Sequence, residues 1–341
     1  MLGRLEWAEL DSQALIGNPL RDPARRPLLA YLPPAHDAGV ERYPAVYFLH
    51  GFTGSARGWT NVTAFQPSVP ERLDALVASG AVPPVVGIFV DGWTALGGSQ
   101  WVNSEATGRY RDYLARDVVA FVDARWRTIP RPGARAVVGK SSGGYGALVM
   151  GRHHPEVFAH VGCHAGDAGF EYCYLPDFPK AAAALEGADP ATWLEGMLRR
   201  ARETKLRGDD HETLNAIAMA AAYSPRAGAP LGLELPFDPR TARLRDDVWA
   251  RWLAHDPVRF VPEAIERFRT LRSVYVDCGT RDEFNLRWGA RMVVESLRAG
   301  GVEVVHEEFD DGHRGVDYRY ARSLSYLVPR MDREERLEPT A

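Results

Sequence analysis

One serine of the chain lies in a pattern that supports nucleophilic chemistry. It is Ser141, in Gly139-Lys140-Ser141-Ser142-Gly143, which follows the pattern G-x-S-x-G. Residues 134–138 before it are short and apolar, as in a buried strand, and residues 147–150 after it are typical of a helix. A serine on a sharp turn between a strand and a helix exposes its hydroxyl, and the N-terminus of the new helix favours negative charge nearby. The pattern therefore predicts that Ser141 attacks a carbonyl carbon.

A serine hydroxyl is a poor nucleophile at neutral pH, so it needs a histidine base and a carboxylate that orients this base. His313 lies in a glycine-flanked loop after the last expected strand. Two aspartates compete for the third role. Asp277 ends an expected strand, whereas Asp282 lies in the loop beyond Gly279. We favour Asp282, because a loop side chain can turn toward His313, and keep Asp277 as the alternative.

A second glycine-containing loop is expected to hold an oxyanion. The apolar run 45–49 ends in His50-Gly51-Phe52-Thr53-Gly54. The backbone N–H groups of Phe52 and Ser142 would stabilise the negative charge of a tetrahedral intermediate. Four further residues near these motifs are expected to line the substrate pocket: His50, Trp93, Trp101 and Tyr145.

These residues need a scaffold that brings them together. Apolar strand-like runs alternate with helical patterns along most of the chain, which predicts a mostly parallel sheet with helices on both faces. Phe52, Ser141, Asp282 and His313 each come just after an expected strand. Ligands of such sheets bind beyond the carboxyl ends of the strands, so the four residues are expected to meet there.

The alternation stops in the middle of the chain, where helical patches are broken by proline and glycine. We therefore expect a core of residues 1–168 and 263–330, a helical lid or cap over residues 169–262, and a flexible tail from 331 to 341. Because the insertion leaves and re-enters the sheet at its carboxyl edge, it should cover Ser141 and supply aromatic pocket walls. The alternative is that its aromatics form only its own small core.

Composition narrows the classes of function. The 341 residues carry a net charge of −4, with 45% hydrophobic and 25% charged residues, which is typical of a globular protein and unlike a nucleic-acid-binding one. No apolar run suggests a membrane span, and the N-terminus does not resemble a signal peptide. The three cysteines indicate reduced thiols and a cytoplasmic location. No metal-ligand spacing or dinucleotide motif predicts a cofactor. The oligomeric state cannot be inferred.

Several motifs together resemble the esterase D-like esterase family, which includes S-formylglutathione hydrolases, feruloyl and acetyl-xylan esterases, siderophore esterases and mycolyltransferases. The resemblance covers roughly residues 25 to 165 and 270 to 328. It rests on 139–147, His50-Gly51-Phe52, 277–283 and Asp311-Gly312-His313. It implies the α/β-hydrolase fold and a serine carboxylesterase that forms an acyl-enzyme on a small ester, without a cofactor. Residues 169–260 have no counterpart in this pattern.

Two other classes of function fit the same motifs. An acyltransferase would use the same three residues but resolve the acyl-enzyme with an alcohol other than water. A binding protein could keep the fold without catalysis, although an intact serine, aspartate and histidine at the expected strand ends argue against it.

Overall fold

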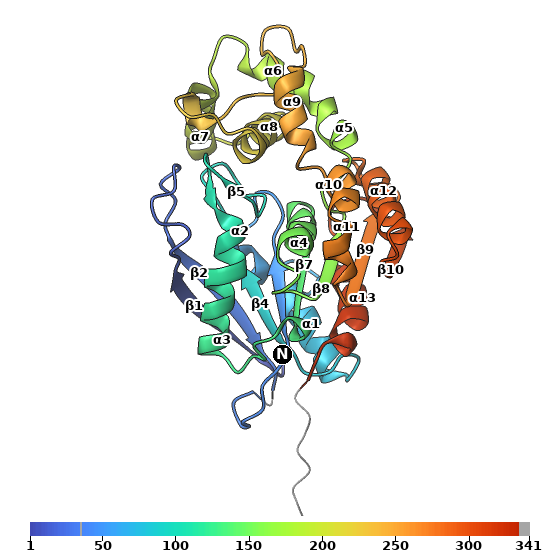
Figure 1. The fold of residues 1–341 in the computed structure, drawn as a ribbon. Helices are drawn as coiled ribbons and strands as arrows, with labels where there is room; N and C mark the ends of the chain where they lie inside the picture. The colour runs from blue at the N-terminus through green and yellow to red at the C-terminus, as the bar shows by residue number, and fades with distance from the viewer. Residues whose placement is uncertain (35, 334–341) are drawn as a thin grey trace, which may run out of the picture.

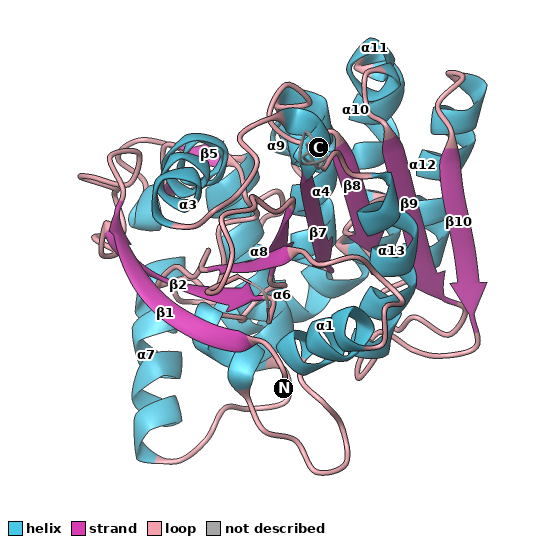
Figure 2. Ribbon diagram, turned by 90° about the horizontal axis from the view of Figure 1, so that it is seen from below, coloured by secondary structure: helices cyan, strands magenta, loops and turns pink. Residues whose placement is uncertain are grey.

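A computed structural model describes residues 1–34 and 36–333. Its centre is an eight-stranded sheet with the order β1-β2-β4-β3-β7-β8-β9-β10. Strand β2 is antiparallel to both of its neighbours, and every other pair is parallel. The strands are β1 (Arg4–Asp11), β2 (Arg25–Leu32), β3 (Ala45–Leu49), β4 (Val86–Val90), β7 (Arg135–Lys140), β8 (His160–His164), β9 (Ser273–Gly279) and β10 (Val304–Phe309). Figure 2 shows the sheet fanned between β1 and β10.

Helices cover both faces of this sheet. One face buries apolar side chains under α1 (Val69–Ala78) and α13 (Tyr320–Leu327). Three groups of helices cover the other face. The first is α2 (Tyr110–Asp112) and α3 (Val119–Arg125), which the π-helical turn η2 (Tyr113–Val118) joins. The second is α4 (Ser142–His153), and the third is α12 (Leu286–Ala299). The central strands are buried on both faces because their residues are almost continuously apolar, as in β3 and β4.

The segment after β8 forms a group of helices at one end of the sheet, at the top of Figure 1. Its helices are α5 (Phe170–Cys173), α6 (Phe178–Leu185), α7 (Pro190–Glu203), α8 (Asp210–Tyr223) and α9 (Asp246–Leu253), and the chain returns through α10 (Pro257–Glu263) and α11 (Ile265–Arg269). Aromatic rings hold these helices together. The Phe178 ring lies 5.6 Å from that of Trp249 and 5.5 Å from that of Trp252, measured between centroids.

This architecture confirms the predicted fold class, a mostly parallel sheet with helices around it. The sequence did not predict β1, an edge strand in which only Leu10 is buried, so its hydrophobic pattern is weak. The long loop after β4 contains a short hairpin of β5 (Asn103–Ser104) and β6 (Gly108–Arg109). Of the expected tail, residues 334–341 lie outside the described residues. Among the described helices, none combines the length and the apolar character needed to cross a membrane.

Two glycines allow α4 to start directly against the sheet. A Cβ atom on Gly143 would lie 2.0 Å from the carbonyl oxygen of Leu49, the last residue of β3. A Cβ atom on Gly139 would lie 2.4 Å from the backbone of Gly143. Both contacts are with backbone atoms that cannot rotate away. The glycines of the G-x-S-x-G pattern are therefore required by packing between α4, β3 and β7.

We predict that Gly143→Ala lowers the free energy of unfolding by more than about 3 kcal/mol, because the added methyl group overlaps the Leu49 carbonyl. Urea unfolding followed by circular dichroism measures the change. Gly196→Ala, in the middle of α7, is the control: its Cβ would meet only the Arg200 guanidinium at 3.7 Å. It should be neutral or stabilising by up to about 1 kcal/mol, since alanine favours a helix. Equal unfolding curves for the two variants would contradict this account.

Candidate active site

Ser141 lies at the turn between β7 and α4 in a strained backbone conformation, with φ 59° and ψ −128°. Its N–H donates to the carbonyl oxygen of His164, at the end of β8, over 2.9 Å. A Cβ atom on Gly51 would lie 3.2 Å from the Ser141 Cβ, a tight contact, so glycine allows the loop to pass close to the serine. A non-glycine residue in this region costs about 1–3 kcal/mol, and such residues cluster at functional sites.

Ser141 and His313 line one cavity of about 380 Å³. The core contributes residues from loops that follow β3, β7, β8, β9 and β10, and the insertion contributes four residues. The lining comprises Gly51, Phe52, Thr53, Gly54, Lys140, Ser141, Ser142, Asp167, Cys173, Tyr174, His211, Asn215, Phe284, Leu286, His313 and Arg314. The cavity thus lies between the carboxyl edge of the sheet and the insertion.

His313 and Asp282 form a buried pair, with 2.8 Å between His313 Nδ1 and Asp282 Oδ2. The other carboxyl oxygen of Asp282 accepts the N–H groups of Phe284 (3.0 Å) and Leu286 (3.3 Å). The His313 N–H donates to a carboxylate oxygen of Glu283 over 2.6 Å. The aspartate is therefore fixed by backbone donors. With its Nδ1 proton directed at Asp282, the imidazole has a lone pair on Nε2 that can accept a proton.

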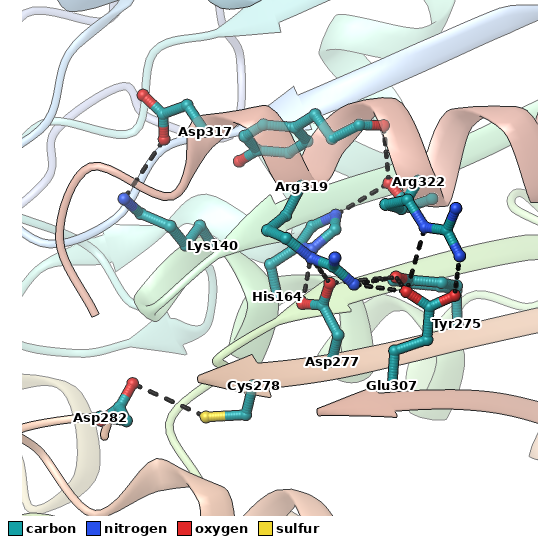
Figure 3. Close-up of polar contacts among 12 residues, drawn as sticks. Lys140, His164, Tyr275, Asp277, Cys278, Asp282, Glu307, Asp317, Arg319 and Arg322 are labelled. Atoms are coloured by element: carbon teal, nitrogen blue, oxygen red, sulfur yellow. Dashed lines mark hydrogen bonds and ion pairs between the residues drawn. The ribbon is translucent and has the colours of Figure 1, made fainter. Parts of the chain in front are cut away.

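Asp277, the alternative acid, pairs with a different histidine. Its Oδ1 lies 2.7 Å from His164 Nδ1, and Arg319 Nε donates to its Oδ2 over 2.8 Å. His164 Nε2 lies 2.8 Å from the Ser323 hydroxyl, which makes a second Ser-His-Asp arrangement. All three of its members are buried, and none lines the cavity. Figure 3 shows this cluster, with Asp282 apart from it.

The buried cluster continues to the surface through Glu307 on β10. Arg319 and Arg322 both donate to its carboxylate, at 2.5 and 2.8 Å. The hydrogen bond from Arg322 and that from Arg319 hold the pKa of Glu307 down at about 2. Asp277 is therefore part of a structural network in which acidic groups alternate with arginines. The network joins β8, β9, β10 and α13.

The two expected oxyanion donors both lie at the cavity. Phe52 and Ser142 line it, and neither N–H has an acceptor among the described residues. The preceding glycine, Gly51, lies against Ser141. Thr53 follows with a positive φ of 62° and donates its N–H to the carbonyl oxygen of Gly97 over 2.8 Å. This bond fixes the loop that presents the Phe52 N–H.

The four residues predicted for the pocket walls do not line this cavity. His50 is buried behind the loop, where its Nε2 accepts a backbone N–H over 2.8 Å, and burial lowers its pKa. Trp101 packs against it and donates to its carbonyl oxygen over 3.3 Å. Tyr145 is fully buried on α4 and donates to the backbone of the insertion over 3.1 Å. Trp93 is 40% exposed on the surface. His50, Trp101 and Tyr145 are therefore part of the packing behind the site.

Most of the residues that line the cavity were not predicted from the sequence. The insertion contributes Cys173, Tyr174, His211 and Asn215, of which the last two are one turn apart on the same face of α8. Of the aromatic residues of the insertion, which were expected to supply pocket walls, Tyr174 lines the cavity, while others such as Phe178 pack inside the insertion. No signal in the sequence separates these two groups.

Asp167 is also at the cavity, three residues beyond the end of β8. Its position after a strand was visible in the sequence and is the signal that could have identified it. Burial raises the pKa of its carboxyl group. Burial likewise lowers the pKa of His211 on the opposite wall. The described residues contain no cluster of three or more acidic, histidine or cysteine side chains that could hold a metal ion.

We predict that Asp277→Asn lowers the free energy of unfolding by about 2–4 kcal/mol, because it removes the charge that compensates Arg319 in a buried pair. Glu308→Gln, on the same strand as Glu307, is the control. Glu308 pairs with Arg291 at the surface, and an exposed pair contributes only about 0–1 kcal/mol. Chemical denaturation of the two variants at neutral pH measures the difference, and a loss for Asp277→Asn no larger than for Glu308→Gln would contradict it.

Comparison with known proteins places the chain in a family. The family described as "Putative esterase" matches residues 23–320. S-formylglutathione hydrolase of Mus musculus is 25% identical over 171 residues, which are 48% of this chain and 58% of that protein, so the match spans little more than half of the mouse enzyme.

Solved structures share the fold. A ferulic acid esterase superimposes with a TM-score of 0.61 at 19% identity, covering 96% of this chain and 99% of the other. An S-formylglutathione hydrolase from Agrobacterium tumefaciens gives 0.56 at 16% identity, covering 97% and 96%. These likenesses confirm the α/β-hydrolase fold, and the family match confirms the resemblance drawn from the motifs. The chain belongs to the esterase family that matches nearly its whole length.

Proposed function

We propose that this protein is a serine carboxylesterase that hydrolyses a small carboxylic ester through Ser141, His313 and Asp282. The observation that carries the proposal is the 2.8 Å pair between His313 and Asp282 at the cavity that Ser141 lines. Membership of an esterase family supports it, as does the strained turn at Ser141. In this proposal Asp277 has no part in the chemistry, because its histidine is buried away from the cavity.

In the first step, His313 Nε2 takes the proton of the Ser141 hydroxyl as the oxygen attacks the ester carbonyl carbon. Asp282 keeps the imidazole in the tautomer that accepts at Nε2 and stabilises the imidazolium that forms. The carbonyl oxygen becomes an oxyanion, for which the N–H groups of Phe52 and Ser142 are the proposed donors. Donors fixed in place by the fold are effective because they need no reorganisation during the reaction.

The intermediate then collapses, and His313 gives its proton to the departing alcohol. This leaves an acyl group on Ser141. Water, activated in turn by His313, attacks the acyl carbon, and the second tetrahedral intermediate releases the carboxylic acid and restores the serine. The residues named supply every proton transfer of this cycle, so the proposed reaction uses no cofactor.

We predict that Ser141→Ala lowers kcat for a short-chain p-nitrophenyl ester by at least about a thousandfold, because the nucleophile is removed. The variant should also lose labelling by a fluorophosphonate, which reacts only with an activated serine. Ser323→Ala is the matched control, since it removes the serine of the buried arrangement. It should keep labelling at Ser141. Turnover by Ser141→Ala above about a hundredth of the wild-type value would exclude Ser141 as nucleophile.

We further predict that Asp282→Asn lowers kcat by about a hundredfold or more, because an amide neither fixes the required tautomer nor stabilises the imidazolium. Asp277→Asn should retain kcat within about threefold per folded molecule, since it acts on stability alone. Kinetics on samples shown to be folded by circular dichroism separate the two effects. The assignment of the acid would be reversed if Asp277→Asn showed the larger kinetic loss.

A further inference from the structure

Asp167 is a buried carboxyl group that the proposed chemistry does not use. It follows β8, is only 7% exposed and lines the cavity beside Ser142. Its Oδ2 accepts three hydrogen bonds, from Gln100 Nε2 (2.9 Å), the Tyr174 hydroxyl (2.9 Å) and the Ser142 hydroxyl (3.2 Å). Among the described residues no lysine or arginine pairs with it, and no donor reaches its Oδ1.

Gln100 shows that this cluster is built at a conformational cost. Gln100 and Trp101 have positive φ angles of 52° and 55°, in a loop where neither residue is a glycine. Gln100 is 1% exposed, and its amide nitrogen also reaches the Tyr223 hydroxyl over 3.0 Å. Its Oε1 is buried and has no partner among the described residues. Strained backbone and an unpaired buried acceptor are retained where a site needs them.

The carboxyl oxygen of Asp167 that accepts no hydrogen bond from the protein determines which groups of a ligand could bind beside it. One of its oxygens is saturated by protein donors, and the other is free in a side chain that lines the cavity. Oδ1 is not one of the buried side-chain atoms that lack a partner, so part of it remains accessible. Burial raises the pKa of this carboxyl, whereas its three hydrogen-bond donors lower the pKa and favour the ionised form, which can only accept hydrogen bonds. Cys173, Leu286 and Asn215 also line the cavity, and none of them donates a hydrogen bond to Asp167. A ligand that fits this wall therefore carries a hydrogen-bond donor.

We propose that Asp167 is a substrate-binding residue that accepts a hydrogen bond from a hydroxyl or amino group on the ester. The inference rests on the proposed esterase function and adds the class of substrate: a short ester with a donor group near the ester bond. The protein should then prefer such esters over unsubstituted ones. A site built around a buried acceptor discriminates strongly, because an analogue without the donor leaves the acceptor unpaired.

A structural role would make a different prediction. Gln100 and Asp167 belong to the core, whereas Tyr174 and Tyr223 belong to the insertion, so the cluster also ties the two together. If this tie were its whole purpose, weakening Asp167 would change the turnover of all esters alike. The ratio of rates for two substrates that differ only in the donor group distinguishes the two roles.

The test compares kcat/KM in two series of esters. The acyl series is p-nitrophenyl butyrate, 3-hydroxybutyrate and 3-aminobutyrate, and the alcohol series is ethyl and 2-hydroxyethyl butyrate, followed by acid release. The acyl series separates the hydroxyl from the amino group, and the two series show which side of the ester faces Asp167. We expect the wild type to favour a donor-bearing ester by at least about tenfold in one series, and Asp167→Asn to reduce that ratio to below about threefold.

Asp256→Asn is the matched control. Asp256 is a fully buried carboxyl that accepts the N–H groups of Gly169 and Phe170 at the start of the insertion but does not line the cavity. Its variant should keep the wild-type ratio whatever its stability. If Asp167→Asn does not fold, Asp167→Ser replaces it, because a smaller hydroxyl removes the charge without adding volume.

The outcomes are distinct. A wild-type ratio near one in both series would overturn the proposal, as would an equal loss on all esters in the Asp167 variant. If the wild type hydrolysed no ester and Ser141 took no fluorophosphonate label, the proposed function would fail, and this inference with it. Hydrolysis of the unsubstituted esters without any preference would overturn the inference alone.

Discussion

The site depends on a contact between backbone atoms, the approach of Gly143 to the carbonyl oxygen of Leu49. It allows α4 to begin at once after β7, so the turn has no room for a relaxed loop. Ser141 takes a positive φ as a result, and its N–H finds its acceptor on the neighbouring strand, at His164. The position of the Ser141 side chain at this turn thus depends on close packing between α4 and the strands β3 and β7. This packing is possible because glycine has no Cβ atom.

Several residues with a strained backbone lie in loops at the carboxyl edge of the sheet, where Ser141 also lies. The loops after β3, β4, β7, β8 and β9 each contain at least one non-glycine residue with positive φ: Thr53, Gln100, Trp101, Ser141, Ala165 and Asn285. Such conformations persist only where surrounding packing determines them. Here the sheet supplies that packing, because five strands buried on both faces hold the start of each loop. Six of the ten described non-glycine residues with positive φ thus lie in loops at this edge of the sheet.

The sequence predicted the parts of this structure whose signal is local. Runs such as 45–49 form strands because nearly every residue is buried, and Ser141, His313 and Asp282 follow strand ends that topology brings together. The sequence did not predict which residues line the cavity, because that depends on the direction in which each side chain points. Trp101 donates to the carbonyl oxygen of His50 and Tyr145 to that of His255, and neither lines the cavity, although both lie next to predicted motifs. The direction of a side chain cannot be predicted from its residue type or from its spacing to a motif.

The insertion shows the same limit at a larger scale. Its helices were visible as patterns, but a helix can turn its aromatic residues inward or toward the sheet without a change in periodicity. In the structure Phe178, Trp249 and Trp252 face one another, and the cavity receives the smaller polar face of α8, with His211 and Asn215. The part of the lining that the insertion contributes is therefore more polar than its aromatic composition alone would indicate.

The two histidine–aspartate pairs consist of the same residue types but differ in whether a ligand in the cavity can reach the histidine. Both pairs join Nδ1 to a carboxylate at nearly the same distance, 2.7 Å for His164 and 2.8 Å for His313. In the first, Nε2 is bonded to the Ser323 hydroxyl and Arg319 donates to Asp277, and because His164 is buried and does not line the cavity, its imidazole is out of reach of a ligand there. Its carbonyl oxygen instead holds the Ser141 N–H in place. The backbone of His164 thus helps to position Ser141, whereas in the proposed reaction the pair at the cavity moves the proton.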